Sequence, residues 1–266
     1  TDRLRKPSRM YRWRKGNREE DTVKIAYAWW VFLGSLLIAI PLRICQIAFL
    51  VDHRGFFLDH GVTAIILTLF VLCSAATIIT MCHLDKHSPK RYTPVKNIPA
   101  GAMAILAAIA VIVHSILQIV YSGGSDGSDL SEISAELASQ FSSGQEYLSI
   151  LLGFLGVVAG IVWLIQAAGH FLGRNLFAAH PVFSLFPSIW LCCTLVSSII
   201  NYTSYVNLSE NICDMLAIMF LLLFVFAQTK LAAKQQIVRS GKGVYAFGFS
   251  AMLFVGVTAL PNLFFQ

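Results

Sequence analysis

Seven long apolar stretches, separated by short polar segments, make up most of the sequence. Each has about 20 residues or more, enough to cross ~30 Å of hydrocarbon as a helix at ~1.5 Å per residue. They are continuously apolar rather than alternating, and backbone polar groups in hydrocarbon must be paired within the protein, which favours helices over barrel strands. We therefore predict an all-α, polytopic transmembrane helical bundle with about seven spanning helices. The predicted spans are 25–51, 61–82, 98–121, 147–172, 182–206, 211–233 and 244–264.

Composition supports a membrane location. The chain is 56% hydrophobic and only 13% charged, whereas soluble domains carry roughly 25% charged residues. A soluble fold of 266 residues could not bury so much apolar surface in one core. The expected partner is therefore the lipid bilayer, with the protein as a multi-pass component of the cell membrane. The chain begins at Thr1 rather than Met, and we expect a fragment that lacks a short piece at one or both ends.

Basic residues are distributed as in an oriented membrane protein. Nine of the twenty Lys and Arg residues precede residue 25, so the net charge of +6 does not indicate nucleic-acid binding. The segments 83–97, 173–181 and 234–243 carry Lys or Arg, whereas 122–146 has five acidic residues and no basic one. Because cytoplasmic loops are enriched in Lys and Arg, we predict that the N-terminus lies inside and the C-terminus outside.

This orientation divides the chain into two parts. Residues 1–24 form a basic cytoplasmic tail, and residues 25–266 form the transmembrane domain with an acidic outer loop at 122–146. Lys and Arg beside the first span attract anionic lipid headgroups at roughly 1 kcal/mol per residue. The same charges are also sufficient simply to fix the topology.

Local patterns predict how several helices begin and pack. Pro99 fits the first turn of the third helix, and Asn207 with Glu210 fits a capping box for the sixth. Leu130, Ile133, Leu137 and Phe141 share one helical face, which predicts a short amphipathic helix over 129–141 on the outer surface; a disordered acidic loop is the alternative. Small residues at helical spacing in the third and fourth helices predict that other helices approach them closely. They are Gly101, Ala104, Ala108, Gly153, Gly156 and Gly160.

Polar residues inside the spans are the candidate functional groups, because placing them in hydrocarbon is costly. With the predicted orientation, several of them reach the outer half of the membrane. We predict a ligand-binding pocket open to the outside, in which Arg43 suggests an anionic ligand and pairs with Asp214. Its residues are Arg43, His114, Gln118, Asn201 and Asp214. The alternative is structural: Arg43 reaches the headgroups, Asp214 favours a helix N-terminus and His114 bonds a neighbouring helix.

The sequence predicts no cofactor, metal or catalytic residue. His83, Asp85 and His87 form one candidate metal cluster, and Asp52, His53, Asp59 and His60 form another, but the ordinary role of such residues is at the headgroups. All six cysteines lie within or at the ends of apolar spans, as small buried hydrophobic residues rather than a disulfide framework. Asp214 is the one carboxylate clearly inside a span, which argues against an enzyme.

Two stretches carry a resemblance to a known group. The first is Arg43-x-x-Gln46 followed by Gly55-Phe56-Phe57-x-Asp59, and the second runs from Asn201 through Asn207 to Asp214. They resemble uncharacterised multi-spanning membrane proteins of Gram-positive anaerobic bacteria. The resemblance implies a bacterial cell membrane and no catalytic or binding residue.

Three classes of function remain open. A non-enzymatic membrane protein that senses or scaffolds ranks first, because polar residues are sparse in the middle and inner parts of the spans. A transporter or permease component for a small solute, with an anion as one candidate, ranks second. An intramembrane enzyme acting on lipid ranks third.

Overall fold

The structure is a computed structural model that describes residues 9–50, 62–84, 96–122, 132–178, 180–202, 208–233 and 240–265. Its principal helices are α1 (Arg9–Leu50), α2 (Val62–Leu84), α3 (Ile98–Ser122), α4 (Glu132–Leu172), α5 (Phe186–Tyr202), α6 (Leu208–Ala232) and α7 (Ser240–Phe265). Two short 3₁₀ helices, η1 (Leu176–Ala178) and η2 (Pro181–Leu185), precede α5.

The predicted all-α bundle of seven spans is confirmed. The seven helices are long and apolar enough to cross a membrane. Their apolar segments match the predicted spans closely. They are Tyr27–Phe49, Val62–Leu84, Ile98–Tyr121, Tyr147–Leu172, Pro181–Ile200, Ile212–Leu231 and Gly241–Pro261. This protein is therefore an integral, multi-pass membrane protein.

Two helices extend well beyond their spans. α1 begins at Arg9, so the helix continues through most of the predicted basic tail. α4 has 41 residues from Glu132 to Leu172, roughly 60 Å at 1.5 Å per residue. The prediction of a separate short helix over 129–141 is therefore wrong, because the helical pattern continues without a break into the fourth span. Ser143-Gly144 is a turn signal within residues 132–146, but α4 contains no proline and continues through this pair.

The fifth span begins differently from the others. The predicted start at 182 falls in η2, and the α-helix follows only at Phe186. Pro181 and Pro187 lack a backbone N–H, so each fits the first turn of a helical segment better than its middle. Pro99 likewise occupies the first turn of α3, as predicted.

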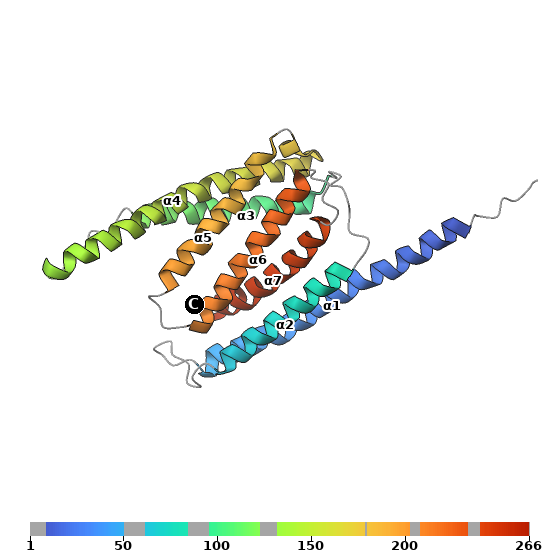
Figure 1. Ribbon diagram of the computed structural model, residues 1–266, viewed down its shortest axis with the longest axis horizontal. Coiled ribbons are helices and arrows are strands. Elements are labelled where there is room, and N and C mark those ends of the chain that lie inside the picture. Colours follow the sequence, from blue (N-terminus) through green and yellow to red (C-terminus); the bar gives the residue numbers. More distant parts are fainter. Residues whose placement is uncertain are drawn as a thin grey trace, which may run out of the picture. The chain divides into compact units, whose positions relative to one another are not determined.

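The chain forms two compact units. Unit 1 comprises residues 1–90, 205–227 and 237–266, and in it α1, α2 and α7 pack against one another. α1 and α2 run side by side, as Figure 1 shows. The core of unit 1 is apolar and contains Val71, Ile78, Leu253 and Phe254. Phe254 of α7 stacks on Phe220 of α6, with ring centroids 5.3 Å apart.

Unit 2 comprises residues 91–204 and 228–236. α3 and α4 lie side by side along their lengths, and α5 packs on α4 (Figure 1). The predicted glycine contacts are confirmed: Cβ atoms built at Gly153, Gly156 and Gly160 would collide with α3 side chains at Ile119, Ser115 and Ile112. These glycines therefore allow a closer approach of the two helices than any side chain would permit.

Candidate functional site

The most distinctive polar group in unit 1 lies where α1 ends and α2 begins. Arg43 and Gln46 are three residues apart in α1, so they share one helical face. Both are buried, with only 7% of Arg43 and 2% of Gln46 exposed. Thr63 is the second residue of α2 and completes the group, which we call the Arg43 cluster.

Hydrogen bonds fix the orientation of this cluster. The Arg43 guanidinium donates through Nη1 to Gln46 Oε1 at 2.9 Å. Gln46 Nε2 in turn donates to Thr63 Oγ1 at 3.3 Å, so the amide bridges the two helices. Gln46 is a neutral acceptor, and this contact orients the guanidinium. A hydrogen bond to a charged group contributes about 1.5–3 kcal/mol, which partly offsets the cost of burying Arg43.

A second polar contact joins α2 to α6 one to two turns further along. The Thr68 hydroxyl donates to the Ala64 carbonyl at 2.8 Å, and its oxygen lies 3.3 Å from Cys213 Sγ. A hydroxyl has one proton, and Thr68 uses it on Ala64. We therefore assign Cys213 as the donor to Thr68. This contact places Cys213 beside the second turn of α2.

The predicted site residues fall into both units. Arg43 and Asp214 belong to unit 1, where Arg43 is buried and the Asp214 side chain is exposed. His114 and Gln118 belong to unit 2, where His114 is exposed and Gln118 Nε2 donates to Ser149 Oγ at 3.2 Å. Asn201 lies in α5, and its side chain is outside the described part of the structure. The common pocket and the Arg43–Asp214 ion pair stay predictions.

Unit 2 contains a buried polar side chain that the sequence analysis missed. Ser115 of α3 is fully buried, and among the described residues its hydroxyl has no hydrogen-bond partner. It faces Gly156 of α4, and the indole Nε1 of Trp190 lies 2.8 Å from the point that a Gly156 Cβ would occupy. The glycine spacing does not identify Ser115 as the residue opposite Gly156, because the neighbouring glycines Gly153 and Gly160 face isoleucines.

Thr63 and Ser149 are also polar partners that the sequence analysis did not single out. Each is a hydroxyl residue near the end of a span that bonds the side-chain amide of a neighbouring helix. A hydroxyl in an apolar helix can equally bond its own backbone, as Thr68 and Ser74 do. Sequence alone therefore does not distinguish the two roles.

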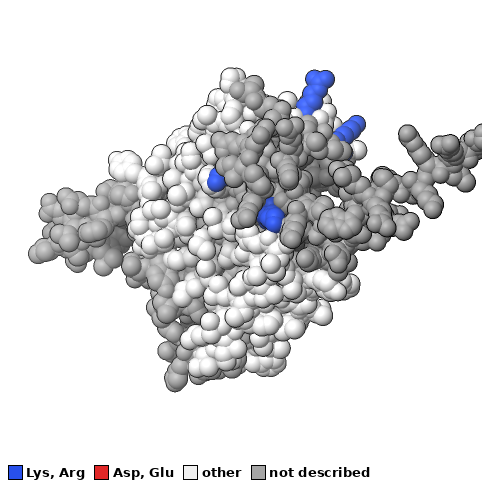
Figure 2. Space-filling view, turned by 45° about the vertical axis from the view of Figure 1, so that its right-hand side comes forward, with Lys and Arg blue, Asp and Glu red and all other residues white. Residues whose placement is uncertain are grey.

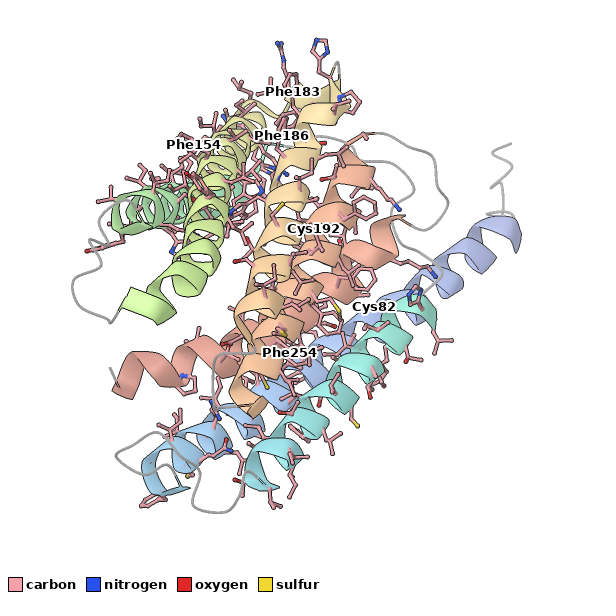
Figure 3. The ribbon with its side chains drawn as sticks, turned by 60° about the vertical axis from the view of Figure 1, so that its left-hand side comes forward. Cys82, Phe154, Phe183, Phe186, Cys192 and Phe254 are labelled. Carbon is pink, nitrogen blue, oxygen red and sulfur yellow. The ribbon has the colours of Figure 1, made fainter. Side chains whose placement is uncertain are left out.

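The cysteine prediction needs a correction. None of the six cysteines forms a disulfide, but Cys45, Cys73 and Cys192 are exposed, and only Cys82 is buried. Figure 3 labels Cys82 and Cys192 on their helices. Because lipid tails are as apolar as a protein core, a thiol needs no burial against other helices in a membrane.

The two candidate metal clusters, which the sequence analysis did not favour, lie mostly outside the described residues. Of their members only His83 is described, and its backbone carbonyl accepts a hydrogen bond from Lys242 Nζ at 2.8 Å. The described residues contain no group of three or more potential metal ligands. Lys242 of α7 therefore interacts with the C-terminal end of α2, where a positive charge complements the helix dipole.

Comparisons with protein families, with curated proteins and with solved structures find no match for this chain. The class of protein therefore rests on the fold: a multi-pass helical membrane protein with a buried arginine cluster between its first two helices.

Proposed function

We propose that this chain is a non-enzymatic membrane protein that senses, or assembles around, a small anionic group bound at the Arg43 cluster. The observation that carries the proposal is the buried guanidinium, held by Gln46 and through it by Thr63 of the next helix. Guanidinium groups present planar N–H donors that match carboxylate and phosphate oxygens. With the predicted orientation, the ligand would arrive from the outer side of the cell membrane.

The apolar interior of unit 1 favours binding over transport. Leu253 and Ile78 are fully buried and Phe254 is 1% exposed, all within one apolar cluster. A pathway for an anion needs polar groups along its length. The described polar side chains of the Arg43 cluster stand at one end of α1 and α2, so this unit supports a site at that end rather than a path through it.

Ligand-induced stabilisation tests the proposal. The full chain in phosphatidylcholine nanodiscs would be titrated separately with inorganic phosphate, sulfate and acetate while its melting temperature is measured. We expect at least one anion to raise the melting temperature by several degrees, since a ligand at 100 times its Kd stabilises by about 2.7 kcal/mol. Arg43→Gln should abolish this response, and Arg43→Lys should retain part of it because lysine keeps the charge without the planar fork.

Lys242→Gln is the matched control, because it removes a cation that already bonds the His83 carbonyl. An unchanged response in Arg43→Gln, or the absence of any response to all three anions, would contradict the proposal. Arg43-dependent uptake of the same anion into proteoliposomes would replace sensing with transport.

A further inference from the structure

We propose that Lys96 and Arg174 of unit 2 form a binding site for the headgroup of one anionic phospholipid. Lys96 lies two residues before α3 begins, and Arg174 lies two residues after α4 ends. Both side chains are exposed. The site is separate from the Arg43 cluster, which belongs to unit 1.

Backbone contacts hold these two cations next to each other. Asn97 N–H donates to the His170 carbonyl at 3.1 Å, and Arg174 N–H donates to the Gly169 carbonyl at 3.1 Å. Between them, Gly173 has φ 64°, a left-handed conformation typical of the residue that ends a helix. A Cβ at Gly173 would lie 3.3 Å from Lys96 N and 3.6 Å from Lys96 Cβ. The Lys96 side chain therefore starts beside the residue that precedes Arg174.

The start of α3 is itself fixed. Asn97 caps the helix, with its Oδ1 accepting a hydrogen bond from Ala100 N–H at 3.2 Å. Lys96 is therefore attached to an ordered helix start rather than to a free loop. A preorganised pair of cations loses less entropy on binding an anion than two independent side chains would.

The position of the pair along the spans points to lipid. The apolar spans end at Ile98 and at Leu172, so both cations lie just beyond the hydrocarbon, at the level of the headgroups. Two residues from each cation along the chain lies an exposed apolar side chain: Ile98 is 58% exposed and Leu172 is 64% exposed. Phe183 stacks on Phe186 with ring centroids 6.2 Å apart, and Figure 3 shows the two near one end of α5. Two cations next to the apolar ends of the spans match a phospholipid, whose anionic headgroup adjoins its apolar acyl chains.

The charge around the pair favours an anionic lipid over a zwitterionic one. Residues 96–122 and 147–202 contain no Asp or Glu, so these helices offer the cations no carboxylate. Figure 2 shows Lys and Arg side chains on the described part of one face of the molecule. Arginine can bind two phosphate oxygens at once, while lysine acts as a point charge. A choline group would bring a third cation to the same place.

A purely structural role is the competing explanation. Lys96 and Arg174 stand at the C-terminal end of α4, where positive charge complements the helix dipole without any ligand. The two explanations differ in one measurable respect: only a lipid site retains phosphatidylglycerol.

Native mass spectrometry of the detergent-purified full chain tests the site. The protein would be incubated with phosphatidylglycerol, with phosphatidylcholine, or with inorganic phosphate alone. We expect the wild type to retain one more phosphatidylglycerol than Lys96→Gln/Arg174→Gln, and each single variant to bind it about fivefold more weakly. Lys96→Arg/Arg174→Lys should retain the lipid, and Lys242→Gln should match the wild type because its ammonium is already engaged with His83.

Equal retention by the wild type and the double glutamine variant would overturn the proposal. So would equal retention of phosphatidylcholine, or binding of inorganic phosphate as tight as that of the lipid. If the double variant does not fold, protection of the wild type decides the question. Phosphatidylglycerol, but not phosphatidylcholine, should slow phenylglyoxal modification of Arg174, and equal rates in the two lipids would refute the site.

Discussion

Several hydroxyl groups in the spans are satisfied by the backbone of their own helix. Thr68, Ser74 and Thr77 of α2, and Ser250 and Thr258 of α7, donate to the backbone carbonyl four residues earlier. This local bond lets a hydroxyl sit in an apolar helix without a partner from elsewhere. Gln46 has a longer side chain and instead joins two side chains on neighbouring helices, so its loss has a different consequence.

Gln46→Ala should destabilise the protein by about 1.5–3 kcal/mol, because it removes the acceptor of a hydrogen bond from a buried guanidinium. Thr63→Val should cost less, about 0.5–1.5 kcal/mol, since the hydrogen bond from Gln46 Nε2 that it removes joins two neutral groups. Thermal unfolding in the same detergent would measure both. Thr258→Val is the control, because its hydroxyl bonds only backbone carbonyls of its own helix. An effect of Gln46→Ala no larger than the control would show that this contact contributes nothing to stability.

At the scale of helices, unit 2 depends on the close approach of α3 and α4. The buried glycines of α4 face Ala108, Ile112, Ser115 and Ile119, which recur at the spacing of one face of α3. Gly101 of α3 makes the converse contact, where a Cβ would lie 2.9 Å from the Phe171 ring. Small residues on each helix thus receive large ones from the other.

Gly156→Ala should destabilise unit 2 by about 1–3 kcal/mol, since its Cβ would overlap the Ser115 hydroxyl and approach Trp190 Nε1 at 2.8 Å. Adding Ser115→Gly should recover part of the loss by removing the opposing atoms. Gly34→Ala in α1 is the matched control, because a Cβ there meets nothing within 4 Å. Thermal unfolding of the three proteins measures the effect, and equal costs at Gly156 and Gly34 would refute the packing argument.

At the scale of the whole molecule, the sequence predicts the spans better than the site. Span boundaries depend on the length of hydrocarbon to be crossed, so hydropathy locates Val62–Leu84 and Ile98–Tyr121 within one or two residues of the prediction. Where a helix ends outside the membrane depends on local breakers instead, and the basic and acidic flanks at 9–24 and 132–146 contain too few of them to stop α1 and α4.

The candidate site was harder to predict, because the depth of a residue along its helix does not determine whether its side chain is buried against other helices or exposed. Arg43 and His114 share a predicted depth, yet one is buried and the other exposed. Facing depends on which helices are neighbours, and the sequence offers no rule for that in an all-helical membrane protein. The partner Thr63 follows only from the pairing of α1 with α2.

The orientation of the whole chain in the membrane is the remaining prediction, and it rests on the distribution of basic residues between the segments that connect the spans. The segments containing Ser88 and Ser125 differ in charge: residues 83–97 carry four basic residues, and residues 122–146 carry none. We expect Ser125→Cys to react with a membrane-impermeant polyethylene glycol maleimide in intact cells, and Ser88→Cys to react only after permeabilisation. The wild type supplies the background from its six native cysteines, and detergent solubilisation should make both introduced thiols reactive. Labelling of Ser88→Cys in intact cells with protection of Ser125→Cys would invert the chain. The Arg43 cluster would then face the cytoplasm, and the Lys96–Arg174 pair would face the outer leaflet.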